Sequence, residues 1–115
     1  MIRVLLVEDE MLVRAIAEED LAEIGCDVTS AGTGDEALAI IEGGARFDLL
    51  VTDIRMPGSL DGWALARMAR DIDPGIRVIY VSGYPGENHE PVEDSHFIKK
   101  PYRMDQLREA VLPTA

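Results

Sequence analysis

The chain has 115 residues, of which 47% are hydrophobic, and this length suits one domain with a single core. Acidic residues outnumber basic ones by 22 to 11, and the resulting formal charge of -11 argues against unaided binding to nucleic acid. No apolar run approaches the roughly 20 residues that cross a bilayer, which argues against membrane insertion. The sequence has one cysteine, Cys26, and no secretory signal pattern, so the expected location is the cytosol.

The N-terminal part of the chain predicts two strands, each followed by a helix. Short continuous apolar runs indicate the strands, and apolar residues at helical spacing follow each of them. Thr33, with Glu36 three residues later, is a capping-box pattern that begins the second helix. Gly25 and the pair Gly43-Gly44 supply the helix ends. The expected elements are a strand at 2–7, a helix at 12–24, a strand at 26–30 and a helix at 33–44.

The C-terminal part of the chain predicts three more strands and two more helices. Prolines follow both helices, as is common after a helix end. The expected elements are strands at 47–53, 76–82 and 96–99 and helices at 64–72 and 104–111. Strands that alternate with helices, and that are apolar on both faces, imply a parallel sheet covered on both sides. The fold class is therefore α/β with a doubly wound five-stranded sheet, and we expect residues 1–115 to form one domain without an output domain.

Polar, chemically capable residues follow four of the five expected strands. In an open α/β sheet, the ligand crevice lies at the carboxyl ends of the strands, where such residues would meet. These residues are Glu8-Asp9-Glu10 after the first strand, Asp53 at the end of the third, Ser82 at the end of the fourth and Lys100 after the fifth.

This set of side chains suits phosphoryl transfer. Carboxylates that lie together repel one another unless a cation neutralises them, and Mg²⁺ prefers such oxygen ligands. A lysine ammonium and a serine hydroxyl are suitable partners for phosphoryl oxygens. An aspartate can itself act as the nucleophile and form an aspartyl phosphate. The sequence therefore predicts transfer of a phosphoryl group onto a carboxylate, with Mg²⁺ and a lysine balancing the charge.

Four spaced motifs resemble the receiver domains of two-component response regulators. "VLLVEDE" is similar to their acidic-pair strand, "DLLVTDIRMPG" with "LDGW" to the phosphoacceptor region, "VIYVSGY" to the hydroxyl strand and "FIKKPY" to the lysine-proline turn. The resemblance covers essentially the whole chain. It implies a flavodoxin-like receiver fold with strand order 2-1-3-4-5, and a histidine kinase or phosphotransfer protein as phosphodonor.

The resemblance also implies roles for individual residues. Glu8 stands where many receivers have aspartate, and Ser82 replaces the more usual threonine while keeping the hydroxyl. The implied roles are Asp53 as phosphoacceptor, Asp9 as direct Mg²⁺ ligand with Glu8 as its partner through water, Arg55 as a metal ligand through its backbone carbonyl, Ser82 and Lys100 as contacts of the phosphoryl group, and Phe97 as switch aromatic.

Plainer interpretations exist for each motif taken alone. The segment after Asp53 could be an ordinary turn, since a single motif has a high false-positive risk. Glu8, Asp9 and Glu10 could simply favour a helix N-terminus, which is our interpretation of Glu10. Phe97, judged by its apolar neighbours, could be a core residue. The agreement among four strand ends favours the functional interpretation.

Two other functions compete with a phosphorylation-controlled signalling module. A phosphohydrolase of the haloacid dehalogenase type also uses an aspartate, Mg²⁺, a hydroxyl and a lysine, but that family has a D-x-D pattern where this chain has Arg55 two residues past Asp53. A scaffold that only keeps the fold would not need the intact set of acid, hydroxyl and lysine. We therefore expect no turnover enzyme, although the aspartyl phosphate should hydrolyse by itself.

The segment between the fourth and fifth strands predicts a departure from the usual receiver fold. A receiver normally has its fourth helix there, but Pro85, Gly86 and Pro91 interrupt the segment "GYPGENHEPVEDS". Proline removes a helix donor and biases the preceding residue away from helix, so no unbroken helical stretch of about 12 residues remains. The fourth helix should be shortened or missing.

Overall fold

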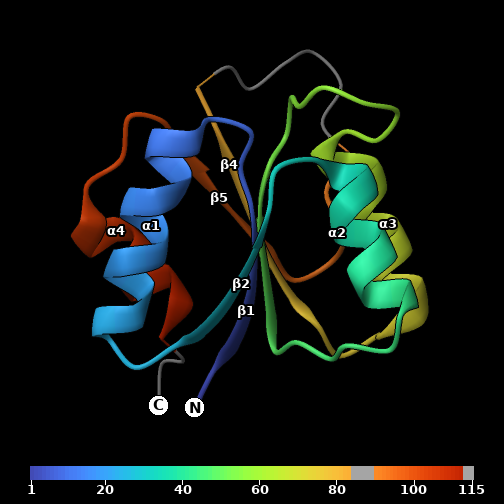
Figure 1. Ribbon diagram of the computed structural model, residues 1–115, viewed down its shortest axis with the longest axis horizontal. Helices are drawn as coiled ribbons and strands as arrows, with labels where there is room; N and C mark the ends of the chain where they lie inside the picture. Colours follow the sequence, from blue (N-terminus) through green and yellow to red (C-terminus); the bar gives the residue numbers. More distant parts are fainter. Residues whose placement is uncertain (84–89, 113–115) are drawn as a thin grey trace.

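The computed structural model describes residues 1–83 and 90–112. All five strands are parallel and lie in the order β2-β1-β3-β4-β5, and helices cover both faces of the sheet (Figure 1). The elements are β1 (Arg3–Val7), α1 (Met11–Glu23), β2 (Asp27–Ala31), α2 (Gly34–Glu42), β3 (Leu49–Asp53), α3 (Gly62–Ile72), β4 (Arg77–Ser82), β5 (Ser95–Lys99) and α4 (Met104–Val111). The predicted fold class and strand order are confirmed.

Local signals explain where the helices begin and end. Thr33 accepts a hydrogen bond from the backbone N–H of Glu36 at 3.1 Å and so caps α2, as the sequence predicts. Asp61 caps α3 in the same way, and this helix begins two residues earlier than predicted. Gly25 has a φ of 91°, a left-handed conformation that ends α1 at little cost for glycine.

The sheet separates two apolar cores. On one face, α2 and α3 pack over side chains such as Leu5, Leu50 and Tyr80, and on the other, α1 and α4 pack over side chains such as Leu6 and Val51 (Figure 1). The central strands are buried on both faces, as predicted for a doubly covered sheet. The edge strands β2 and β5 are less buried. Glu8, Asp53 and Ser82 lie at the carboxyl ends of the central strands β1, β3 and β4.

Two apolar positions of α1 do not face the core. Periodicity predicts a helix here correctly, but Leu12 is 80% exposed and Ile16 is 58% exposed. Only Ala17 and Leu21 of α1 are buried. Apolar spacing identifies a helix face, but whether that face is covered depends on the neighbouring elements. None of the described helices is long and apolar enough to cross a bilayer.

The described residues between β4 and β5, 83 and 90–94, contain no helix, which agrees with the predicted shortening. Residues 84–89, with Pro85 and Gly86, lie outside the described part of the chain. The part nearest β5 is fastened to the core. The Tyr80 hydroxyl accepts a hydrogen bond from the Val92 N–H at 3.0 Å, and Arg70 donates to the Glu93 carbonyl at 2.7 Å.

Candidate functional site

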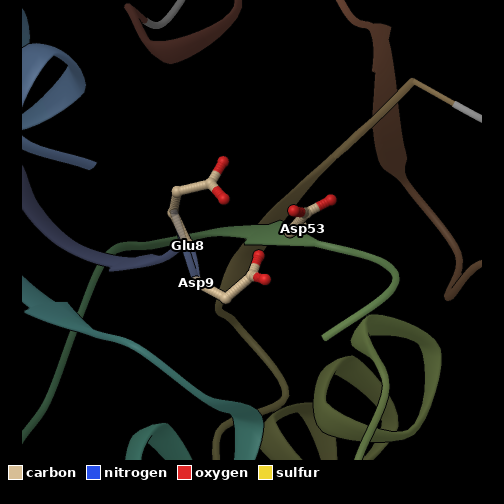
Figure 2. Close-up of side chains that lie close together, drawn as sticks. All are labelled: Glu8, Asp9 and Asp53. Carbon is tan, nitrogen blue, oxygen red and sulfur yellow. The ribbon is translucent and has the colours of Figure 1, made fainter. Parts of the chain in front are cut away.

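Three carboxylates converge at the carboxyl ends of β1 and β3. Glu8 and Asp9 directly follow β1, and Asp53 is the last residue of β3. Because β1 and β3 are neighbours in the sheet and Val7 pairs with Thr52, the two strand ends lie side by side. Figure 2 shows the three side chains together, and their nearest carboxylate oxygens all lie within 4.8 Å of one another.

Lys100 joins this cluster from the turn after β5. Its Nζ lies 2.6 Å from Glu8 Oε1 and 3.2 Å from Asp53 Oδ2, so one ammonium group bridges two carboxylates. Glu8 is buried with a side chain 6% exposed, whereas the side chain of Lys100 is 21% exposed. The other oxygen of Glu8 accepts the Glu10 N–H at 3.1 Å. Both Glu8 oxygens are therefore engaged inside the protein.

Burial and like charge alter the protonation of Asp53. Burial raises the pKa of Asp53 and the neighbouring charge of Glu8 raises it further, to about 6 against an ordinary value of 3.8, although Lys100 acts in the opposite direction. Burial lowers the pKa of Lys100, but its contacts with Glu8 and Asp53 outweigh this and the pKa is raised overall. One lysine thus leaves part of the carboxylate repulsion uncompensated.

The donor set fits a hard divalent cation. Glu8, Asp9 and Asp53 offer oxygen atoms close enough to surround one ion, and Asp9 is exposed, so water ligands have access. A cation would also relieve the repulsion between Glu8 and Asp53 that raises the Asp53 pKa. The structure therefore contains an acidic pocket whose oxygen ligands suit Mg²⁺.

The other predicted site residues, Ser82, Arg55 and Phe97, lie on three different elements and differ in burial. Ser82 is buried at the end of β4, and its carbonyl accepts the Lys100 N–H at 2.8 Å, which ties the ends of β4 and β5 together. Arg55 is exposed in the loop after β3. Phe97 lies in β5 opposite Tyr80 and is 40% exposed, so it belongs to the sheet edge and not to the carboxylate cluster.

Tyr102 is a residue whose place beside the site was not predicted. It lines a groove of about 440 Å³ between α1 and the segment after β5, together with Ile16 and Lys100. It also borders a small cavity of about 10 Å³ beneath Glu8 and Asp53. Burial raises the pKa of its phenol. Its position two residues after Lys100 is visible in the sequence, but only packing shows that it lines both the groove and the cavity beside the carboxylates.

Comparisons with known proteins agree with this geometry. The family model of the response regulator receiver domain matches residues 4–112. The chain is 39% identical over 113 residues to the sensor kinase CckA of Brucella abortus, covering 94% of this chain and 12% of that protein. It is 32% identical over 109 residues to the response regulator receiver protein CpdR of the same organism, covering 91% and 89%. A solved response regulator receiver protein from Sinorhizobium medicae has a TM-score of 0.89 at 36% identity, over 96% of this chain and 90% of that one.

A parallel sheet in the order 2-1-3-4-5 with an acidic pocket at its carboxyl edge defines a receiver-like signalling domain. The family match covers nearly the whole chain, and the chain belongs to the response regulator receiver domains of two-component systems. It is a phosphoacceptor module of a phosphorelay. The alternative of a phosphohydrolase of the haloacid dehalogenase type finds no support in these matches.

Proposed function

We propose that Asp53 is the phosphoacceptor of this receiver. The observation that carries the assignment is its place at the end of a central strand, within hydrogen-bond distance of Lys100 and beside two further carboxylates. A carboxylate oxygen of Asp53 would attack the phosphorus of a phosphohistidine. The P–N bond breaks as the new P–O bond forms, and the electron pair of the broken bond stays on the imidazole.

Asp53 must be ionised to act as nucleophile. Its pKa is about 6 in the metal-free protein. At neutral pH, Asp53 is therefore ionised in most molecules and protonated in a minority. Mg²⁺ held by Asp9, Asp53 and the Arg55 carbonyl, with Glu8 as a partner through water, would balance the charge of the phosphoryl oxygens. Lys100 is placed to leave Glu8 and bind a phosphoryl oxygen on Asp53.

The conformational switch would begin at Ser82 and Lys100. Both are proposed to contact the phosphoryl group, and the bond from the Lys100 N–H to the Ser82 carbonyl links their strand ends. Phe97 lies three residues before Lys100 on the edge strand and is partly exposed, so a displacement of β5 would change its exposure. We infer that partners distinguish the two states at this edge.

The phosphodonor is proposed to dock over α1. This helix exposes Met11 and Leu12, and the groove beside it is lined by Ile16, Tyr102 and Lys100, which also contacts Asp53. A phosphohistidine has to approach Asp53 from the carboxyl ends of the strands, so a histidine kinase or phosphotransfer protein would cover this apolar surface. Leu12→Glu should then slow transfer from the protein donor but not from acetyl phosphate.

We further infer that the domain is not a turnover enzyme and that its aspartyl phosphate hydrolyses by itself. This inference is supported by the family, which is a signalling module, and by the proposed role of Asp53 as the acceptor of the phosphoryl group. The single cysteine, Cys26, is buried and free, which fits a reducing compartment such as the cytosol.

Incubation with candidate histidine kinases and radiolabelled ATP tests the proposal. Asp53→Asn should abolish the label, because an amide is a far poorer nucleophile than a carboxylate. Asp71→Asn, which removes the same charge from an exposed position of α3, is the matched control and should label normally. Full labelling of Asp53→Asn would move the phosphoacceptor elsewhere.

A further inference from the structure

The loop between β3 and α3 is fastened to the first turn of α2 by one pair of residues, Ser59 and Asp35. Ser59 Oγ donates to Asp35 Oδ1 at 2.7 Å, and the Ser59 N–H donates to Asp35 Oδ2 at 3.1 Å. Both oxygens of one carboxylate are thus used on one residue. The Ser59 hydroxyl and N–H bonds lower the pKa of Asp35, so the carboxylate is the form that holds the loop.

Two glycines allow this close approach. Gly58 has a φ of 104°, and a Cβ placed on it would lie 2.8 Å from Asp35 Oδ2. A Cβ on Gly34, the first residue of α2, would lie 2.9 Å from the Leu60 carbonyl oxygen. A side chain at position 34 would press on the backbone of the loop, and one at position 58 would displace the Asp35 carboxylate that holds the loop. The contact between loop and α2 is therefore built into the backbone on both sides.

The other end of the loop is fastened to Asp53 itself. The Gly62 N–H donates to the Ile54 carbonyl at 2.7 Å, and the Ile54 N–H donates to Asp53 Oδ1 at 3.0 Å. Arg55 lies between these bonds and the Ser59 contact. A loop held at both ends has few conformations left for the Arg55 carbonyl.

We propose that Asp35 and Ser59 are positioning residues for the metal and phosphoacceptor site, acting by holding the 54–61 loop in its binding-competent conformation. This inference rests on the proposed function, in which the Arg55 carbonyl is a metal ligand. Neither residue touches the reacting atoms. Without the contact, the loop would sample other conformations. The apparent metal affinity would then fall in proportion to the fraction of molecules whose loop is in the binding-competent conformation.

The decisive variant is Ser59→Ala, because it removes the hydroxyl without changing the net charge. The Mg²⁺ dissociation constant, followed by amide chemical shifts near Asp53, should rise about three- to tenfold. Ser59→Thr keeps the hydroxyl at an exposed position and should restore wild-type affinity. In phosphorylation by acetyl phosphate, the half-saturating Mg²⁺ concentration should rise in Ser59→Ala while the rate at saturating Mg²⁺ stays near wild type.

Two further variants separate the effect of the Asp35–Ser59 contact from the effect of the Asp35 charge. They are Asp35→Asn and the double variant that combines Asp35→Asn with Ser59→Ala. Glu42→Gln removes one charge from the far end of α2 and should leave Mg²⁺ affinity unchanged. If Asp35 and Ser59 act through one contact, the double variant should bind Mg²⁺ no more weakly than Asp35→Asn alone. Melting temperatures measured without Mg²⁺ check that every variant is folded.

Each outcome bears on a separate claim. Wild-type protein that binds no Mg²⁺ and takes no phosphoryl group would remove the proposed function. Wild-type protein that does both, with Ser59→Ala equal to it in Mg²⁺ affinity, would overturn the positioning role alone. A weakened Ser59→Ala that Ser59→Thr does not restore would also overturn it, because the hydroxyl bond would then not be the cause.

Discussion

Lys100 donates a 2.6 Å hydrogen bond to Glu8 across 92 positions of the sequence. The contact joins the end of the first strand to the turn after the last one, and it places a cation beside two carboxylates that would otherwise only repel each other. Glu8 therefore serves as an internal partner of Lys100 in the resting protein. Phosphorylation would have to draw Lys100 away from it.

Lys100→Met should raise the pKa of Asp53 above its value of about 6. The lysine is the group that opposes burial and the charge of Glu8, so its loss leaves both effects uncompensated. The carboxyl ¹³C shift of Asp53, titrated without metal, measures this. Lys99→Met is the matched control, since Lys99 is exposed, and its titration should follow the wild type. Equal midpoints for all three proteins would show that Lys100 does not act on Asp53.

Asp53→Asn should stabilise the metal-free protein at neutral pH by about 1–2 kcal/mol, allowing for residual solvent exposure and the lost Lys100 contact. The pKa of Asp53 is raised from 3.8 to about 6 on folding, so between these values the folded state binds more protons than the unfolded state. Stability contributed by this group therefore falls as the pH rises from about 4 to about 6. Urea unfolding at pH 4.5 and pH 7 tests the sign, because the variant should lose this pH dependence.

Gly62→Ala should destabilise the protein by about 1–3 kcal/mol and weaken Mg²⁺ binding. A Cβ on Gly62 would overlap the carbonyl oxygen of Asp53 and lie 2.8 Å from the Ile54 Cα, so backbone atoms of the site itself must move. Gly75→Ala is the control, because its Cβ would meet only Asp73 Oδ1 at 3.6 Å, an ordinary contact. Denaturant unfolding measures both. A Gly62→Ala variant as stable as Gly75→Ala would mean that the backbone adjusts at no cost.

Tyr80→Phe should destabilise the protein by about 1–2 kcal/mol and speed hydrogen exchange at Val92. The Tyr80 hydroxyl accepts the Val92 N–H at 3.0 Å, and its removal leaves that amide unpaired in a partly buried place. Trp63, which packs against the Tyr80 ring with centroids 4.5 Å apart, should keep its position because the ring remains. Amides of α1 serve as internal reference, and exchange at Val92 unchanged from wild type would contradict the proposed fastening.

Much of the fold could be predicted from local signals. Hydrophobic periodicity located the elements, Thr33 and Gly25 marked helix ends, and the polar residues at strand ends predicted a site at one edge of the sheet. The predictions of the elements and of their ends succeeded because each depends on residues a few positions apart. The same spacing did not show that Leu12 and Ile16 are exposed, because their burial depends on how far neighbouring elements extend over α1.

The sequence by itself determined which chemical groups stand at the strand ends, since a parallel sheet brings the end of each strand to one edge. Only the tertiary structure decided which of them touch. Three such relationships join residues far apart in the chain. Lys100 binds Glu8, Asp35 holds Ser59, and Tyr102 borders the carboxylates. Such contacts leave no periodic signal, because side-chain geometry in a packed interior is set by all neighbouring elements at once.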